Sequence, residues 1–209
     1  MIETLIATFI TFFVVIDPVG NAPIFAGLTP DATAAERRRL ALRGVFIGTL
    51  ILLVFGIVGQ YLFEAMGISI AAFRIAGGIL LLLLSIDMVM ARQSGLRSTT
   101  PGEDEESGHR NDISVFPLAI PLIAGPGSLT SVVLMVTRAS GDLVMQAAIL
   151  GVMLAVLLTL LVTLLLSVQI MKLLGMTGIN VISRVAGVIL AALALQFIID
   201  GATSLYPPS

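Results

Sequence analysis

The sequence predicts an all-α integral membrane protein whose six transmembrane helices form two inverted three-helix repeats. Its 209 residues are 57% hydrophobic and 11% charged, with a mean hydropathy of +1.09, whereas a soluble domain is about 25% charged. The apolar residues gather in six segments that are long enough to cross a bilayer as helices. The first and fourth segments carry helix-breaking sequences at their centres, 108 residues apart from Pro18 to Pro126, which predicts two repeats with a broken helix in each.

The first segment, residues 2–28, contains the sequence IDPVGNAPIF at residues 16–25. At about 1.5 Å per residue, this stretch falls near the middle of the membrane. Asp17 is ionisable, and a charged residue at the centre of a membrane helix costs about 2.5–3.5 kcal/mol. Pro18 removes a backbone donor and clashes with the preceding turn. Irregular backbone at this depth survives only where protein buries it or where it lines a wet cavity, so we expect a site here.

We expect the first helix to restart near Asn21. Gly20 frees the backbone, and Asn21 is a good N-terminal cap for a helix. Pro23 then falls in the first turn of the second half, where its missing N–H is harmless. The first helix is therefore expected to consist of two half-helices that meet at mid-membrane.

The fourth segment, residues 113–136, repeats this arrangement with the sequence PLIAGPGSLTS at residues 121–131. Glycine and proline break the helix, a serine can cap its restart, and a threonine adds a hydroxyl group. These residues are Gly125, Pro126, Gly127, Ser128 and Thr130. The simpler interpretation of both segments is that Pro18 and Pro126 only kink their helices.

Four further segments complete the expected set, at residues 44–63, 71–90, 144–168 and 181–199. The polar stretch after the first segment, with Glu36 and Arg43, is expected to be a linker. Residues 92–112 are hydrophilic and contain an acidic run, so we expect a linker between the two halves. The predicted domains are a first three-helix repeat at 1–91, a linker at 92–112 and a second three-helix repeat at 113–209.

A second sequence match supports the repeat. The sequences RIAGGIL at residues 74–80 and RVAGVIL at residues 184–190 are 110 residues apart. Each half has three segments, which is an odd number, so consecutive halves must enter the membrane from opposite sides. The repeat is therefore expected to be inverted.

The positions of lysine and arginine predict the orientation, because cytoplasmic loops carry an excess of these residues. If the first linker is cytoplasmic, nine basic residues lie inside and two, Arg74 and Arg138, lie outside. The inside residues are Arg37, Arg38, Arg39, Arg43, Arg92, Arg97, Arg110, Lys172 and Arg184. Both termini are therefore expected outside, and the linker between the halves is expected in the cytoplasm.

The two breaks predict a site for a small zwitterion. The N-terminus of a half-helix has unsatisfied N–H groups and a partial positive charge, which suit a carboxylate. The opposite ends offer free carbonyl groups for a cation or an ammonium group. Asp17 is a candidate to bind the amine or to carry a coupling proton. The alternative for Asp17 is a structural hydrogen bond to N–H groups across the break.

Two arginines in equivalent positions, Arg74 and Arg184, have two interpretations. They are anchors whose side chains reach water at the helix entrances, or they latch the opposite repeat by pairing with Asp87 or Asp200. We retain all four residues as candidate gating residues.

Several function classes are disfavoured. The chain has no cysteine, so it has no disulfide and no thiolate metal site, and we expect no cofactor or metal beyond a coupling H⁺ or Na⁺. It has no P-loop pattern for ATP hydrolysis. Its one histidine, His109, lies outside the predicted spans, so Ser128 has no nearby base and we expect no enzyme. No basic patch indicates nucleic acid. Two alternatives remain. One is a channel, in which half-helices also meet at a constriction, and the other is an exporter of other small polar solutes.

Together, IDPVGNAPIF and PLAIPLIAGPGSLTS resemble the paired signatures of the MarC family, also described as small neutral amino acid transporters. The resemblance covers nearly the whole chain. It implies a multi-pass inner-membrane protein, a secondary transporter of the alanine, glycine and serine class, with a small amino acid and the lipid bilayer as partners. The motif residues that the resemblance makes candidates for substrate binding are Asp17, Pro18, Gly20, Asn21, Pro23, Gly125, Pro126, Gly127, Ser128 and Thr130. The resemblance leaves open whether the protein forms a homo-oligomer.

Overall fold

The computed structural model describes residues 2–91 and 113–205, and the secondary structure of these residues is helical. The elements are α1 (Ile2–Ile16), α2 (Pro18–Leu28), α3 (Ala34–Ala65), α4 (Ile70–Met90), η1 (Ser114–Ile123), α6 (Pro126–Arg138), α7 (Leu143–Leu165) and α8 (Ser167–Leu205). Five helical stretches are long and apolar enough to span a membrane, and η1 with α6 makes a sixth. The linker predicted at 92–112 lies outside the described residues.

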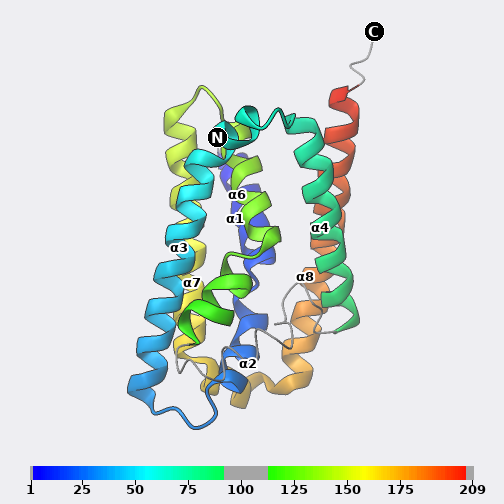
Figure 1. Ribbon diagram of the computed structural model, residues 1–209. Coiled ribbons are helices and arrows are strands. Elements are labelled where there is room, and N and C mark those ends of the chain that lie inside the picture. The colour runs from blue at the N-terminus through cyan, green and yellow to red at the C-terminus, as the bar shows by residue number, and fades with distance from the viewer. Residues whose placement is uncertain (1, 92–112, 206–209) are drawn as a thin grey trace.

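The chain passes along the long axis of the molecule six times (Figure 1). The pair α1–α2, α4 and α7 run in one direction along this axis. Helix α3, the pair η1–α6 and α8 run in the opposite direction. As a result, the start of α1 and the end of α8 lie at the same end of the molecule, which we call the terminal end. The turn between α2 and α3 lies at the opposite end.

Helix α3 begins about ten residues earlier than the sequence predicts and takes in the stretch expected to be a linker. Thr33 and Glu36 explain this start, because they form a capping box. The Thr33 hydroxyl accepts a bond from the Glu36 N–H at 3.3 Å, and the Glu36 carboxylate accepts one from the Thr33 N–H at 2.8 Å. Arg37 also donates to the Thr29 carbonyl, at 2.8 Å from Nη2, which fixes the turn that precedes the helix.

Helix α8 is also longer than predicted, because only Leu166 separates it from α7. Its first turns lie across the opposite end of the molecule before the helix rises to the terminal end (Figure 1). The change of direction occurs at Gly175, whose φ of 62° is a left-handed value that glycine adopts without strain.

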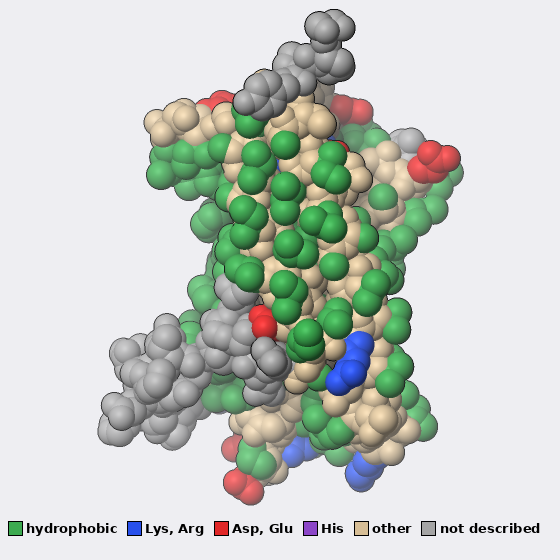
Figure 2. Space-filling model, turned by 90° about the vertical axis from the view of Figure 1, so that its right-hand side faces the viewer, with side chains coloured by type: hydrophobic (Ala, Val, Ile, Leu, Met, Phe, Trp, Pro, Cys, Tyr) green, Lys and Arg blue, Asp and Glu red, His purple; other side chains and the backbone are tan. Residues whose placement is uncertain are grey.

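Large apolar side chains form both the core and the outer surface. Phe12, Phe25 and Phe197 are fully buried, whereas Phe46 and Leu158 are 69% and 61% exposed. Hydrophobic side chains cover most of the middle of the face in Figure 2, and Lys and Arg side chains show mainly in its lower part. A soluble monomer rarely exposes so large an apolar surface. The prediction of an all-helical integral membrane protein is therefore confirmed, with the outer surface facing lipid.

Helices α4 and α8 pack closely and run antiparallel. A Cβ atom on Gly78 would lie 2.7 Å from the Ala194 carbonyl oxygen, and one on Gly187 would lie 2.9 Å from the Met88 Cβ. Early residues of α4 thus meet late residues of α8, and late residues of α4 meet the middle of α8. The matched sequences RIAGGIL and RVAGVIL both supply glycines to this contact, where small residues let two backbones approach.

The first prediction concerns this contact. Gly78→Ala should lower stability by about 1–3 kcal/mol, because the new methyl group would meet backbone of α8 that cannot move aside as a side chain can. Gly151→Ala is the matched control, since a Cβ there has nothing within 4 Å, and alanine in a helix is favoured by about 0.5–1 kcal/mol. Thermal unfolding of both variants in detergent, followed by circular dichroism, measures the difference. Equal unfolding temperatures would contradict the close contact.

Candidate functional site

The first break is built around a single residue, Asp17. Its N–H donates to the Phe13 carbonyl at 3.0 Å and so completes α1. Its backbone then takes φ 50° and ψ 65°, and its carboxylate accepts a hydrogen bond from the Gly20 N–H at 3.0 Å as the cap of α2. The second half-helix therefore begins at Pro18, in the first-turn position that proline favours. The expected restart near Asn21 is wrong, because Asp17 caps the helix four residues earlier.

Asn21 has a different role from the one predicted. Its side-chain amide donates to the Ile16 carbonyl at 2.7 Å, which satisfies an orphan acceptor at the end of α1. Its other side-chain atom, Oδ1, is buried and has no hydrogen-bond partner among the described residues. A buried acceptor without a donor is costly, so this oxygen is suited to a donor from a ligand.

Two further residues of the first motif have clear local roles. A Cβ on Gly20 would overlap the Asp17 carboxylate, so only glycine leaves room for the cap. Pro23 lies inside α2 and not in its first turn, contrary to the prediction. Since proline has no N–H, it leaves the carbonyl four residues earlier without its usual helical donor.

The second break is not capped by a side chain. The irregular helix η1 ends at Ile123, α6 begins at Pro126, and their axes differ by 55°. Gly125 occupies the cap position and makes no side-chain hydrogen bond. The prediction that Ser128 caps the restart is wrong, because Ser128 is the third residue of α6. The first-turn N–H groups of Gly127 and Ser128 therefore have no partner within the helix.

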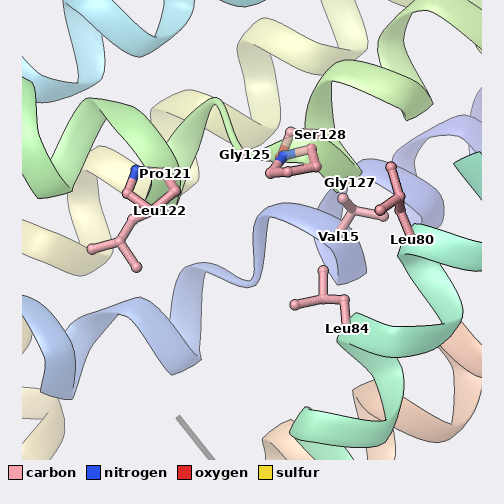
Figure 3. Close-up of a pocket in the computed structure, with 9 residues that line it drawn as sticks. Val15, Leu80, Leu84, Pro121, Leu122, Gly125, Gly127 and Ser128 are labelled. Carbon is pink, nitrogen blue, oxygen red and sulfur yellow. The ribbon is translucent and has the colours of Figure 1, made fainter. Parts of the chain in front are cut away.

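The second break and the end of α1 meet at a small cavity, which we call the inner cavity. Its volume is about 20 Å³, enough for about one water molecule. A Cβ on Gly127 would lie 3.4 Å from the Val15 side chain, which places the end of α1 against the start of α6. Figure 3 shows Val15, Leu80 and Leu84 gathered near Gly127 and Ser128. The lining residues are Val15, Leu80, Leu84, Pro121, Leu122, Gly125, Pro126, Gly127 and Ser128.

The structure divides the predicted site residues into two groups. Four of the predicted residues, all from the second motif, line the inner cavity: Gly125, Pro126, Gly127 and Ser128. Thr130 does not line it; its methyl group packs against Gly77 of α4, where a Cβ would overlap it. Asp17, Pro18, Gly20, Asn21 and Pro23 lie beyond Val15 at the first break and do not line the cavity. The sequence analysis missed the other five lining residues, because an apolar side chain in an apolar segment carries no signal; they are Val15, Leu80, Leu84, Pro121 and Leu122.

One candidate gating residue, Asp200, forms an ion pair within the described part of the chain, and its partner is not one that the sequence analysis proposed. Asp200 pairs with Arg138 and also accepts a hydrogen bond from Gln196 at 2.6 Å. Arg74 lies near enough to Arg138 for their charges to interact, and its buried Nε has no partner among the described residues. Arg184 and Asp87 form no ion pair with each other within the described part of the chain.

The comparisons with known proteins agree on one family. A family model described as MarC family integral membrane protein matches residues 2–206. A UPF0056 membrane protein of Archaeoglobus fulgidus is 38% identical over 93% of this chain and 90% of its own length. The UPF0056 membrane protein YvbG of Bacillus subtilis is 37% identical over 99% and 98%, and YhcE of Escherichia coli is 34% identical over 95% and 92%. No solved structure matches the chain.

The second prediction concerns the cap at the first break. Asp17→Asn should keep the fold, because asparagine tolerates the left-handed backbone and caps helices as well as aspartate does. Asp17→Ala should lower stability by about 1–3 kcal/mol, since it removes the acceptor and places alanine in a left-handed conformation. Unfolding temperature and monodispersity in detergent measure both. If the asparagine variant unfolds as early as the alanine variant, then charge, and not the cap, holds the break together.

Proposed function

The chain belongs to the MarC family of integral membrane proteins, and from this premise we propose that it is a secondary transporter of small neutral amino acids. Its substrates are of the alanine, glycine and serine class, and it moves them across the inner membrane by alternating access around the two breaks. The observation that carries the proposal is the uncapped start of α6, which faces the inner cavity against the end of α1.

The start of α6 suits the substrate carboxylate. The N–H groups of Gly127 and Ser128 lack helical partners, and the helix dipole adds a partial positive charge. The start of α2 is different, since the Asp17 carboxylate already accepts from Gly20 there. We therefore assign the carboxylate to α6 alone and not to both half-helices.

The first break suits the substrate ammonium. The Asn21 Oδ1 is a buried acceptor without a donor, and the Asp17 carboxylate lies on the same turn of α2. Carboxylate and amide oxygens accept hydrogen bonds from an ammonium group. Because the lining of the inner cavity includes two glycines, two prolines and a serine, the site favours a small side chain.

Alternating access follows from an inverted repeat, and the packing of α4 against α8 supports one. The two matched sequences lie in helices that run antiparallel, which is the arrangement that two halves of opposite direction produce. We propose that the termini lie outside and that H⁺ or Na⁺ drives transport. A channel is the alternative, although the inner cavity has room for only about one water in this conformation.

The third prediction is a transport measurement. Proteoliposomes that contain the protein should take up labelled glycine and alanine, and they should take up tryptophan at least about tenfold more slowly, because binding differences of about 1.4 kcal/mol correspond to that factor. Vesicles preloaded with unlabelled alanine should accumulate labelled alanine faster, since a carrier exchanges substrates and a channel does not. Tryptophan uptake at the alanine rate would contradict the size limit, and the absence of counterflow would favour the channel.

The fourth prediction separates the two roles of Asp17. Asp17→Asn keeps the cap but removes the charge. If Asp17 meets the ammonium group or carries a proton, alanine uptake should fall by at least about tenfold, and the dependence of uptake on pH should flatten. The measurement is uptake between pH 5 and 8 on protein shown to be folded by size-exclusion chromatography. Unchanged uptake and pH dependence would leave Asp17 as a structural cap only.

A further inference from the structure

A second and much larger cavity lies at the terminal end, between α1, the end of α6, the start of α7 and α8. We call it the terminal cavity. Its volume is about 430 Å³, within the range of about 300–1,000 Å³ that small-molecule sites occupy. Its lining mixes apolar and polar side chains. The polar lining includes Thr4, Thr8, Thr11, Arg138, Asp142 and Gln196.

Arg138 gives the terminal cavity a site for a carboxylate. Its Nη2 pairs with Asp200, and its guanidinium group lies 5.1 Å from the centre of the Phe197 ring. The other guanidinium nitrogens have no hydrogen-bond partner among the described residues, and the side chain is 36% exposed. A guanidinium group carries five N–H donors in a geometry that matches a carboxylate. The nearby charge of Arg74 strengthens the attraction for an anion.

The part of α1 that lines the terminal cavity offers hydrogen-bond acceptors. The Thr8 hydroxyl donates to the Thr4 carbonyl at 2.7 Å, and the Thr11 hydroxyl donates to the Ala7 carbonyl at 2.9 Å. Each hydroxyl has thus used its one proton, and its oxygen can only accept. Asp142 adds a carboxylate to the same lining. A molecule with a carboxylate at one end and an ammonium group at the other would pair with Arg138 and with these acceptors.

The terminal cavity and the inner cavity share the same two helix faces. On α1, Thr11 lines the terminal cavity and Val15, one turn later, lines the inner cavity. On α6, Ser128 lines the inner cavity and Met135 lines the terminal cavity. Between them lies Ser131, which is fully buried and whose hydroxyl has no partner among the described residues. These spacings of three and four residues place the side chains on one face of each helix.

We infer that the terminal cavity is a second binding site for small zwitterionic amino acids and the entrance to the inner cavity from the terminal end. Arg138 binds the carboxylate, and the threonine oxygens of α1 with Asp142 bind the ammonium group. Ser131 lies on the path between the two sites. This inference rests on the proposed function for its choice of ligand, but the cavity and its charges are independent of it.

The chain has no cysteine, so a single introduced thiol reports on the terminal cavity without background. Thr11→Cys is the reporter, and Leu143→Cys, which is 81% exposed and does not line the cavity, is the matched control. A membrane-impermeant methanethiosulfonate is added to right-side-out and to inside-out vesicles. Both thiols should react in the same vesicle orientation, Thr11→Cys more slowly because Thr11 is 2% exposed, and alanine should slow the reaction of Thr11→Cys but not that of Leu143→Cys. A Thr11→Cys thiol that does not react, or that alanine does not protect, would overturn the inference.

Two variants in the Thr11→Cys background test the roles of Arg138 and Asp200. They should change the alanine concentration needed for protection in opposite directions. Arg138→Gln should raise the alanine concentration needed for protection by about tenfold or more, because it removes the charged donor. Asp200→Asn should lower that concentration, because it removes the carboxylate that competes for Arg138. A merely structural ion pair would make both variants change protection in the same direction, and that result would overturn the inference.

The same experiments separate this inference from the proposed function. Counterflow of alanine without protection of Thr11→Cys would overturn the inference and leave the transport proposal intact. Protection of Thr11→Cys without any uptake or counterflow would support the terminal cavity as a binding site and contradict the transport proposal.

Discussion

The backbone polar groups at a helix break are the constraint on which the rest of this molecule depends. In the hydrocarbon core no water is available, and each unpaired N–H or carbonyl group costs several kcal/mol. At the first break the chain solves this with its own side chains. Asp17 accepts from the Gly20 N–H, and Asn21 donates to the Ile16 carbonyl. At the second break no side chain caps the start of α6.

The two breaks therefore differ in how their backbone polar groups are paired. The first break is tightly built, since no Cβ fits at Gly20 beside the carboxylate, and it leaves one acceptor, the Asn21 Oδ1, without a partner among the described residues. The second break leaves the N–H groups of Gly127 and Ser128 beside the inner cavity. Two similar motifs along the chain thus form one break that is held by its own residues and one that has N–H donors to offer. The proposed ligand chemistry follows from this inequality and not from the symmetry of the two motifs.

The sequence predicts the spans and the breaks well, because hydropathy and the Pro–Gly clusters are strong local signals. It does not predict where α2 restarts, because Asp17 and Asn21 are both good caps and only the left-handed backbone of Asp17 decides between them. It places Thr130 in the site, although the helical turn directs it to Gly77 of α4. It also misses the pairing of Arg138 with Asp200, since two charges 62 residues apart carry no local signal that they meet.

The packing around the inner cavity indicates which part must move for it to open. Helices α4 and α8 approach each other at the level of the backbone, at Gly78 and the Ala194 carbonyl, and α6 is fixed to α4 where Thr130 fills the space at Gly77. We therefore expect these three helices to move as one unit, because close-packed backbones resist small shifts. Helix α1 lines the inner cavity with the Val15 side chain and also forms one wall of the terminal cavity. A displacement of α1 from α6 would therefore widen the inner cavity and join it to the terminal cavity in one step.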